Sequence, residues 1–221
     1  MVFGFWETEK KEEPSSSRVS PFMRQKWARV FDMKDLRKVG KVEEQDFVEW
    51  GRRAAYNAGV KFTNELQQHW ESAHRAYFGS NVTKKAFIQH LAEFAEMEDS
   101  VKMASDMNAL LMKCVDLNGD GVVSWKEFYY WIAPLGVSED EGKKAFDICD
   151  LDGNGTLDRD EFATACARYY FDMEMSECAN FYGPYEEDNE IVDLGNNFDN
   201  DIAGEKNDFE RKSVFLCCFH N

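Results

Sequence analysis

The stretch Asp116-Leu117-Asn118-Gly119-Asp120-Gly121-Val122-Val123-Ser124-Trp125-Lys126-Glu127 decides how this chain folds. Side chains that carry oxygen stand at positions 1, 3, 5, 9 and 12, and the main-chain carbonyl of position 7 adds a further donor. A hard divalent cation such as Ca²⁺ takes about 6 to 8 oxygen ligands, which this spacing supplies. Gly121 stands at position 6, where the loop reverses and a positive φ is needed. The predicted ligands are Asp116, Asn118, Asp120, the Val122 carbonyl, Ser124 through a water molecule, and Glu127 through both carboxylate oxygens.

A second copy of the pattern begins 34 residues later. Position 6 is again glycine, and position 8 is apolar in both copies (Val123 and Leu157), which predicts a short antiparallel ladder between the two loops. This repeated spacing is that of the EF-hand, in which a calcium loop links two helices. We therefore expect two Ca²⁺ ions, with Mg²⁺ as a competitor, in loop 3 (residues 116–127) and loop 4 (residues 150–161). The predicted ligands of loop 4 are Asp150, Asp152, Asn154, the Thr156 carbonyl, Asp158 and Glu161.

The N-terminal half holds two candidate partner loops, and both lack the ligands of loops 3 and 4. Loop 1 (residues 35–46) has Gly40 at position 6 and Val42 at position 8, but Arg37 and Val39 occupy the ligand positions 3 and 5. A positive charge inside a partly desolvated loop repels a cation by about a few kcal/mol. Loop 2 (residues 77–83) is shorter and almost uncharged. We expect both loops to be structural, and weak binding at loop 1 stays an open alternative.

Four helix pairs follow from the apolar periodicity around these loops. The expected fold class is all-α, with four EF-hand units in two pairs, compact, and with short β ladders between paired loops. We divide the chain into a mobile N-terminal arm (1–19), an N-terminal pair (20–97), a C-terminal pair (98–184) and an acidic, disordered tail (185–221). One continuous helix is expected over residues 101–115, before loop 3. In the tail, residues 199–210 imitate a calcium loop, but Ala203 and Lys206 at positions 5 and 8 argue against a site.

The composition narrows the class of protein. A net charge of −16 offers no basic stripe for nucleic acid. No apolar run reaches the length of about 18 residues that spans a membrane, and the start lacks the pattern of a secretory signal. We therefore expect a cytoplasmic monomer whose internal cysteines are reduced core residues. Cys217 and Cys218 stand in an apolar run that could be acylated, but we favour free thiols and expect no membrane association.

The chain resembles a group of four-hand proteins: the sarcoplasmic calcium-binding proteins, calexcitin and the coelenterate luciferin-binding proteins. The resemblance rests on the two intact loops, the frame Phe31-x-x-x-Asp35 with Gly40, and the aromatic endings Tyr169-Tyr170-Phe171 and Phe181-Tyr182-Gly183. It implies a compact arrangement of four hands that serves calcium buffering, calcium-triggered signalling or carriage of an apolar ligand. The chain departs from the group in loop 1, which has lost its ligands, and in its tail.

Calcium buffering or sensing through the C-terminal pair is the leading hypothesis, and a sensor would need a target protein. The alternative is a calcium-regulated carrier of an apolar aromatic ligand. The 18 Phe, 6 Trp and 8 Tyr residues would allow one, although aromatic stripes more often form plain core. A luminescent oxygenase would need histidines around its substrate, and only His69, His74, His90 and His220 are present. The sequence has no nucleophile motif, phosphate-binding glycine loop or zinc spacing, so we do not expect an enzyme.

Overall fold

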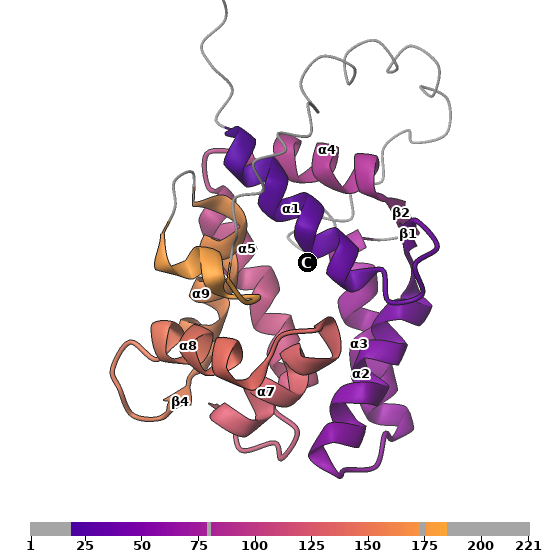
Figure 1. The fold of residues 1–221 in the computed structure, drawn as a ribbon, viewed down its shortest axis with the longest axis vertical. Helices are drawn as coiled ribbons and strands as arrows, with labels where there is room; N and C mark the ends of the chain where they lie inside the picture. The colour runs from indigo at the N-terminus through magenta and orange to yellow at the C-terminus, as the bar shows by residue number, and fades with distance from the viewer. Residues whose placement is uncertain (1–18, 79–80, 173–175, 185–221) are drawn as a thin grey trace, which may run out of the picture.

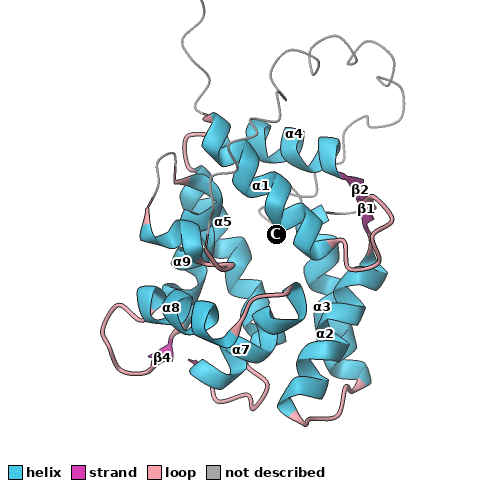
Figure 2. Ribbon diagram, in the orientation of Figure 1, coloured by secondary structure: helices cyan, strands magenta, loops and turns pink. Residues whose placement is uncertain are grey.

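The computed structural model describes residues 19–78, 81–172 and 176–184 (Figure 1). The helices are α1 (Pro21–Lys34), α2 (Glu44–Ala58), α3 (Asn64–Phe78), α4 (Lys84–Ala95), α5 (Ser100–Asn108), η1 (Ala109–Leu111), α6 (Met112–Val115), α7 (Trp125–Ile132), η2 (Ala133–Leu135), α8 (Glu139–Cys149), α9 (Arg159–Phe171) and η3 (Glu177–Asn180). The strands are β1 (Lys41–Val42), β2 (Val82–Thr83), β3 (Val123–Ser124) and β4 (Thr156–Leu157). Figure 2 shows helices joined by loops, so the expected all-α class with short ladders is confirmed.

Several of the sequence predictions concern residues that the structure does not describe. Residues 1–18 of the expected arm and the whole tail from residue 185 lie outside the described residues. The same holds for the imitation loop at 199–210 and for Cys217 and Cys218. The proposed domain boundaries stay predictions.

The helices flank four loops, and short β ladders join these loops in two pairs. Loops 1 and 2 are joined by an antiparallel ladder of β1 with β2, in which Val42 lies opposite Val82. Loops 3 and 4 are joined in the same way by β3 and β4, with Val123 opposite Leu157. All four side chains are buried. The ladder expected between Val123 and Leu157 is therefore confirmed, and each pair buries apolar surface that a single loop would leave in water.

Capping chemistry sets where the helices begin. The Ser20 hydroxyl accepts a hydrogen bond from the Met23 N–H at 3.2 Å, and Pro21 is the first residue of α1, where no N–H donor is missed. The expected capping box starts α8: the Ser138 N–H donates to Glu141 Oε2 at 2.9 Å, and the Glu141 N–H donates to Ser138 Oγ at 3.4 Å.

The helix expected over residues 101–115 is broken. The α-helical hydrogen bonds of α5 end at Asn108, and the tighter turn η1 connects α5 to α6. At this break the Tyr77 hydroxyl of α3 donates to Asn108 Oδ1, and Leu111 is buried. A 3₁₀ stretch inside a helix marks local strain or adjustment. We attribute the break to this contact with α3. Local periodicity cannot predict it, because Tyr77 lies far from Asn108 in the sequence.

The two pairs of hands share one core. The rings of Trp50 on α2 and Trp131 on α7 stack with centroids 5.5 Å apart, and the Trp50 Nε1–H donates to the Trp131 carbonyl at 2.5 Å. α1 is tied to the C-terminal end of α9 by Lys26, whose Nζ donates to the Tyr169 and Asp172 carbonyls at 2.6 and 3.1 Å. Lys26 thus binds carbonyls that a helix end leaves without intrahelical donors. Apolar side chains from Val19, just before α1, to Tyr182, just after η3, form a single cluster, which confirms the expected compact arrangement.

Among the described residues, every helix is too short or too polar to cross a bilayer.

Candidate metal centre

Loop 3 starts where α6 ends, and its first carboxylate folds the loop around itself. Asp116 Oδ1 accepts hydrogen bonds from the Gly119 N–H at 2.7 Å and the Asp120 N–H at 3.2 Å, while Oδ2 accepts from the Gly121 N–H at 2.9 Å. Gly121 has φ +89°, the conformation that the sequence predicts for position 6. These bonds wrap the main chain of loop 3 around the Asp116 carboxylate.

Glu127 closes loop 3 from the first turn of α7. Its Oε1 accepts from the Leu117 and Asn118 N–H groups at 3.1 and 3.2 Å, and its Oε2 accepts from the Ser124 N–H at 2.9 Å. The carboxylate therefore joins the two ends of the loop, and Glu127 as a whole is only 6% exposed. A carboxylate is stable there because the N-terminal end of a helix carries partial positive charge. The Ser124 hydroxyl donates to Glu127 Oε2 at 2.7 Å, so Ser124 positions the carboxylate that is predicted to be the final ligand.

Loop 4 repeats this arrangement with more negative charge. Asp150 Oδ2 accepts from the Gly155 N–H at 2.9 Å, as Asp116 does from Gly121. Glu161 joins the loop ends through the Leu151 N–H at 2.9 Å and the Asp158 N–H at 3.1 Å. Carboxylate oxygens of Asp150, Asp152 and Glu161 all lie within 4.8 Å of one another. Three carboxylates this close repel one another unless a cation joins them, and an all-oxygen set is the one that Ca²⁺ and Mg²⁺ prefer.

In loop 4 the structure brings the carboxylates of Asp150, Asp152 and Glu161 close together. In loop 3 the predicted residues Asp116, Asn118, Asp120 and Glu127 are linked by hydrogen bonds within the loop. Ligation itself stays a prediction for Asp116, Asn118, Asp120, Val122, Ser124, Glu127, Asp150, Asp152, Asn154, Thr156, Asp158 and Glu161. Loop 1 differs, because the Arg37 guanidinium lies among its carboxylates, where it donates to Asp46 Oδ1 at 3.0 Å. Loop 2 passes through residues 79–80, which the structure does not describe.

One feature that the sequence analysis missed is a buried lysine. Lys34, the last residue of α1, is 2% exposed, and its Nζ donates to the Tyr170 hydroxyl at 2.8 Å. Aromatic rings surround the ammonium group, with centroids 5.5 to 6.0 Å away. No carboxylate of the described chain pairs with it, and burial lowers the pKa of Lys34 to about 7. In the sequence, the one signal that marks Lys34 is its position directly before loop 1.

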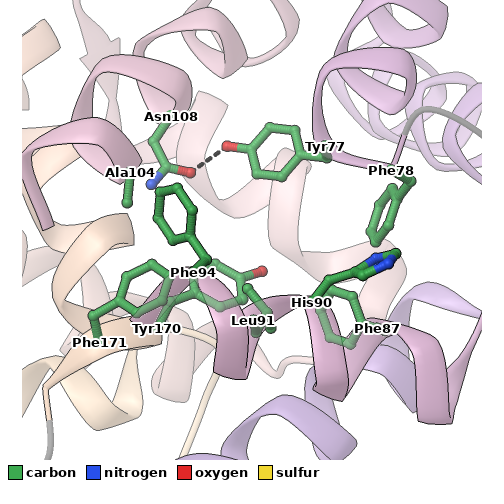
Figure 3. A pocket seen from close by; sticks show the side chains of 10 residues that line it. All are labelled: Tyr77, Phe78, Phe87, His90, Leu91, Phe94, Ala104, Asn108, Tyr170 and Phe171. Atoms are coloured by element: carbon green, nitrogen blue, oxygen red, sulfur yellow. Dashed lines mark hydrogen bonds between the residues drawn. The ribbon is translucent and has the colours of Figure 1, made fainter. Parts of the chain in front are cut away.

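A small cavity adjoins this cluster (Figure 3). Its volume is about 30 Å³, and Tyr77, Phe78 and Tyr170 lie both on its wall and around Lys34. His90 also reaches the wall, so one of the four histidines does face a cavity. The space would hold a water molecule or two, whereas pockets for small organic ligands have volumes of about 300–1,000 Å³. The remaining lining residues are Phe87, Leu91, Phe94, Ala104, Asn108 and Phe171.

Family models match both halves of the chain. The model of an EF-hand domain pair matches residues 24–133, and an EF-hand model matches residues 143–167. The chain is 41% identical over 63 residues to calerythrin of Saccharopolyspora erythraea, a match that covers 27% of this chain and 36% of calerythrin. It is 32% identical over 104 residues to the luciferin-binding protein of Renilla reniformis, covering 45% of this chain and 56% of that protein. The matches thus span between a third and just over half of these relatives.

Solved structures show the same fold. The coelenterazine-binding protein of Renilla muelleri, in its calcium-loaded apo form, superposes with a TM-score of 0.69 at 21% identity, covering 78% of this chain and all of that one. Apoaequorin in complex with (S)-HM-daCTZ superposes with a TM-score of 0.59 at 21% identity, covering 80% of this chain and 98% of that one. At these identities the likeness concerns the fold alone.

Proposed function

Because the chain belongs to the EF-hand superfamily, in the group that includes calerythrin and the luciferin-binding proteins, we propose that it binds one Ca²⁺ in loop 3 and one in loop 4 and acts as a calcium buffer. It is a calcium-binding EF-hand protein on the strength of its family. The two intact oxygen sets support the number of ions and their place.

One observation favours a buffer over a sensor: the chain itself covers the apolar face that a sensor would expose. Phe181, just after η3, packs against Phe128 and Trp131 of α7 and Phe162 of α9, with ring centroids 5.6, 5.7 and 6.2 Å apart. These residues belong to the helices that leave loops 3 and 4. Calcium sensors open such a helix pair to reveal a groove, whereas buffers hardly move.

The covering segment is also held by α1. The Arg29 guanidinium of α1 donates to the Tyr182 and Gly183 carbonyls at 3.1 and 3.2 Å. Tyr182 is fully buried, with its ring centroid 4.8 Å from that of Tyr169. Opening the C-terminal pair would therefore require removing Phe181 and Tyr182 from the core and breaking the contacts to α1, at a cost of about several kcal/mol.

Dye binding tests this role. Saturating calcium is expected to leave the fluorescence of a hydrophobic dye such as anilinonaphthalene sulfonate unchanged with the wild-type chain. The Phe181→Ala variant is expected to show a calcium-dependent rise, since its groove is no longer filled. Phe181→Ala combined with Glu127→Gln and Glu161→Gln serves as control and should bind dye independently of calcium. A strong calcium-dependent rise with the wild type would replace the buffer by a sensor.

A second candidate, a carrier of an apolar aromatic ligand, is favoured by buried donors without acceptors. The indole N–H groups of Trp70 and Trp131 are buried and have no partner among the described residues. A ligand with carbonyl oxygens could accept from them, but the core would have to expand well beyond its 30 Å³ cavity. Quenching of tryptophan fluorescence by added coelenterazine, reversed by calcium, would support this role. Titration without quenching would exclude it.

We further propose a cytoplasmic, non-enzymatic monomer. Cys114, Cys149, Cys166 and Cys178 are free thiols in the core, and burial raises the pKa of the Cys114 and Cys149 thiols. Buried, protonated thiols react poorly and suit a reducing compartment. Size-exclusion chromatography with light scattering tests the monomer.

A further inference from the structure

Loop 1 has the internal hydrogen bonds of an ion-binding loop although its ligand positions are altered. Asp35 Oδ2 accepts from the Gly40 N–H at 2.8 Å, as the first carboxylates of loops 3 and 4 accept from their glycines at 2.9 Å. At position 12, Asp46 accepts from the N–H of position 9, Glu43, at 2.9 Å, and from that of position 3, Arg37, at 3.2 Å. Glu127 and Glu161 accept from the same two positions in loops 3 and 4. The three loops therefore share one frame.

The centre of this frame is occupied by a side chain of the loop itself. The guanidinium of Arg37 forms a two-pronged contact with Asp46, from Nε to Oδ1 at 3.0 Å and from Nη2 to Oδ2 at 3.2 Å. The same group donates to Glu43 Oε2 and, from Nη1, to Gln45 Oε1 at 2.6 Å. The side chains at positions 9, 11 and 12 thus meet one planar cation, the geometry at which arginine excels.

Side-chain length explains why the guanidinium fits. Loops 3 and 4 end in glutamate, whereas loop 1 ends in Asp46, whose carboxylate is one methylene shorter and stands farther back. The side chain of Asp46 is completely buried, so its charge would be costly without a partner. Hydrogen bonds to Asp46 first, and then to Glu43, raise the pKa of Arg37 above its usual value, so the charge is permanent.

We propose that Arg37 is the resident cation of loop 1 and prevents this loop from binding calcium: its guanidinium neutralises and joins the loop's carboxylates, as a bound ion would in loops 3 and 4. The N-terminal pair then keeps its ladder and helix arrangement at any calcium concentration. α2, which begins next to this contact, presents Trp50 to Trp131 of α7. The hand of loop 1, in which Arg37 takes the place of the ion at every calcium concentration, thus packs as a rigid element against the hand of loop 3, which binds calcium.

The experiment uses the full chain with Glu127→Gln and Glu161→Gln, so that loops 3 and 4 contribute little to the measured calcium binding. The result then does not depend on the proposed function. In this background Arg37→Asn with Val39→Asp gives loop 1 the ligand types of loop 3 at positions 3 and 5. We expect one additional Ca²⁺ per chain by calorimetry, a lower melting temperature in EDTA, and recovery on adding calcium. The background with Arg37 intact should show none of the three. Arg53→Asn is the matched control, because Arg53 pairs with Glu49 on α2, away from the loop.

Two results would overturn the proposal: calcium uptake by loop 1 while Arg37 is present, or a doubly substituted loop that takes no calcium or melts in EDTA at the temperature of the background. Val39→Asp alone guards against a variant that does not fold, since Val39 is 54% exposed. It supplies the missing ligand but leaves the guanidinium in place, so it should bind no more calcium than the background. Uptake by that single variant would show that Arg37 does not hold the site.

Discussion

Replacement of the buried Lys34 by methionine should change how the stability of the protein depends on pH. Burial lowers the pKa of Lys34 from 10.5 to about 7, and its Nζ has only the Tyr170 hydroxyl and the faces of aromatic rings as partners within the described chain. Between pH 7 and 10.5 the unfolded chain therefore binds more protons at this position than the folded chain. Stability rises with pH wherever the unfolded state binds more protons. Below pH 7 both states are protonated, and the cost of burying the ammonium is fully present.

The size of the effect follows from the same values. A fall in pKa from 10.5 to about 7 corresponds to about 5 kcal/mol between the two protonation states. Loss of the bond to Tyr170 costs about 1–3 kcal/mol, so Lys34→Met should be more stable than the wild type by about 2–4 kcal/mol at pH 6. From pH 7 to pH 9 the wild type should regain about 2 kcal/mol relative to the variant.

Urea unfolding in EDTA at pH 6, 7, 8 and 9, followed by far-ultraviolet circular dichroism, measures this difference. The wild type and Lys34→Met are compared with Lys61→Met, a substitution of an exposed lysine that should leave the pH dependence unchanged. A stability difference between the wild type and Lys34→Met that is constant from pH 7 to pH 9 would show that Lys34 does not titrate in this range and that burial does not lower its pKa as described.

Two further predictions concern packing. Leu157→Ala removes a fully buried partner of Val123 in the ladder and should cost about 2–5 kcal/mol and weaken calcium binding, whereas Leu151→Ala, 71% exposed in the same loop, should change stability by less than about 0.5 kcal/mol in thermal unfolding. Gly51→Ala would place its Cβ 2.4 Å from Trp70 Nε1 and should cost about 1–3 kcal/mol, while Gly142→Ala should cost less because its nearest neighbour, Ile132 Cδ1 at 2.9 Å, is the flexible end of a side chain. If the two variants of either pair lost equal amounts of stability, the packing described here would be wrong.

The sequence predicts best what depends on neighbours in the chain. The calcium loops are defined by oxygen donors and glycines at fixed intervals, and Ser20-Pro21 marks the start of α1 because both effects act within one helical turn. The apolar residues at position 8 predict the ladder for the same reason: the pairing of the loops follows from their own pattern. These features need no knowledge of distant parts of the molecule.

The remaining features depend on contacts between distant segments. The break of the helix before loop 3 follows the contact of Asn108 with Tyr77, and Lys34 meets Tyr170 only because α1 lies across α9. For Arg37 the sequence predicted repulsion of an ion. It could not show that the guanidinium would turn inward and bind Asp46, because arginine at such a position can equally extend into solvent. The cover that Phe181 forms over α7 and α9 is likewise invisible to local pattern.

Calorimetric titration with calcium of the wild type, Glu127→Gln and Glu161→Gln shows whether loops 3 and 4, and they alone, bind the ion. We expect two ions per wild-type chain and one per single variant. We also expect Glu161→Gln to lose the tighter site, because loop 4 offers four carboxylates and loop 3 offers three. Three or more ions in the wild type, or two ions left in either variant, would contradict the assignment of one ion to each of the two loops.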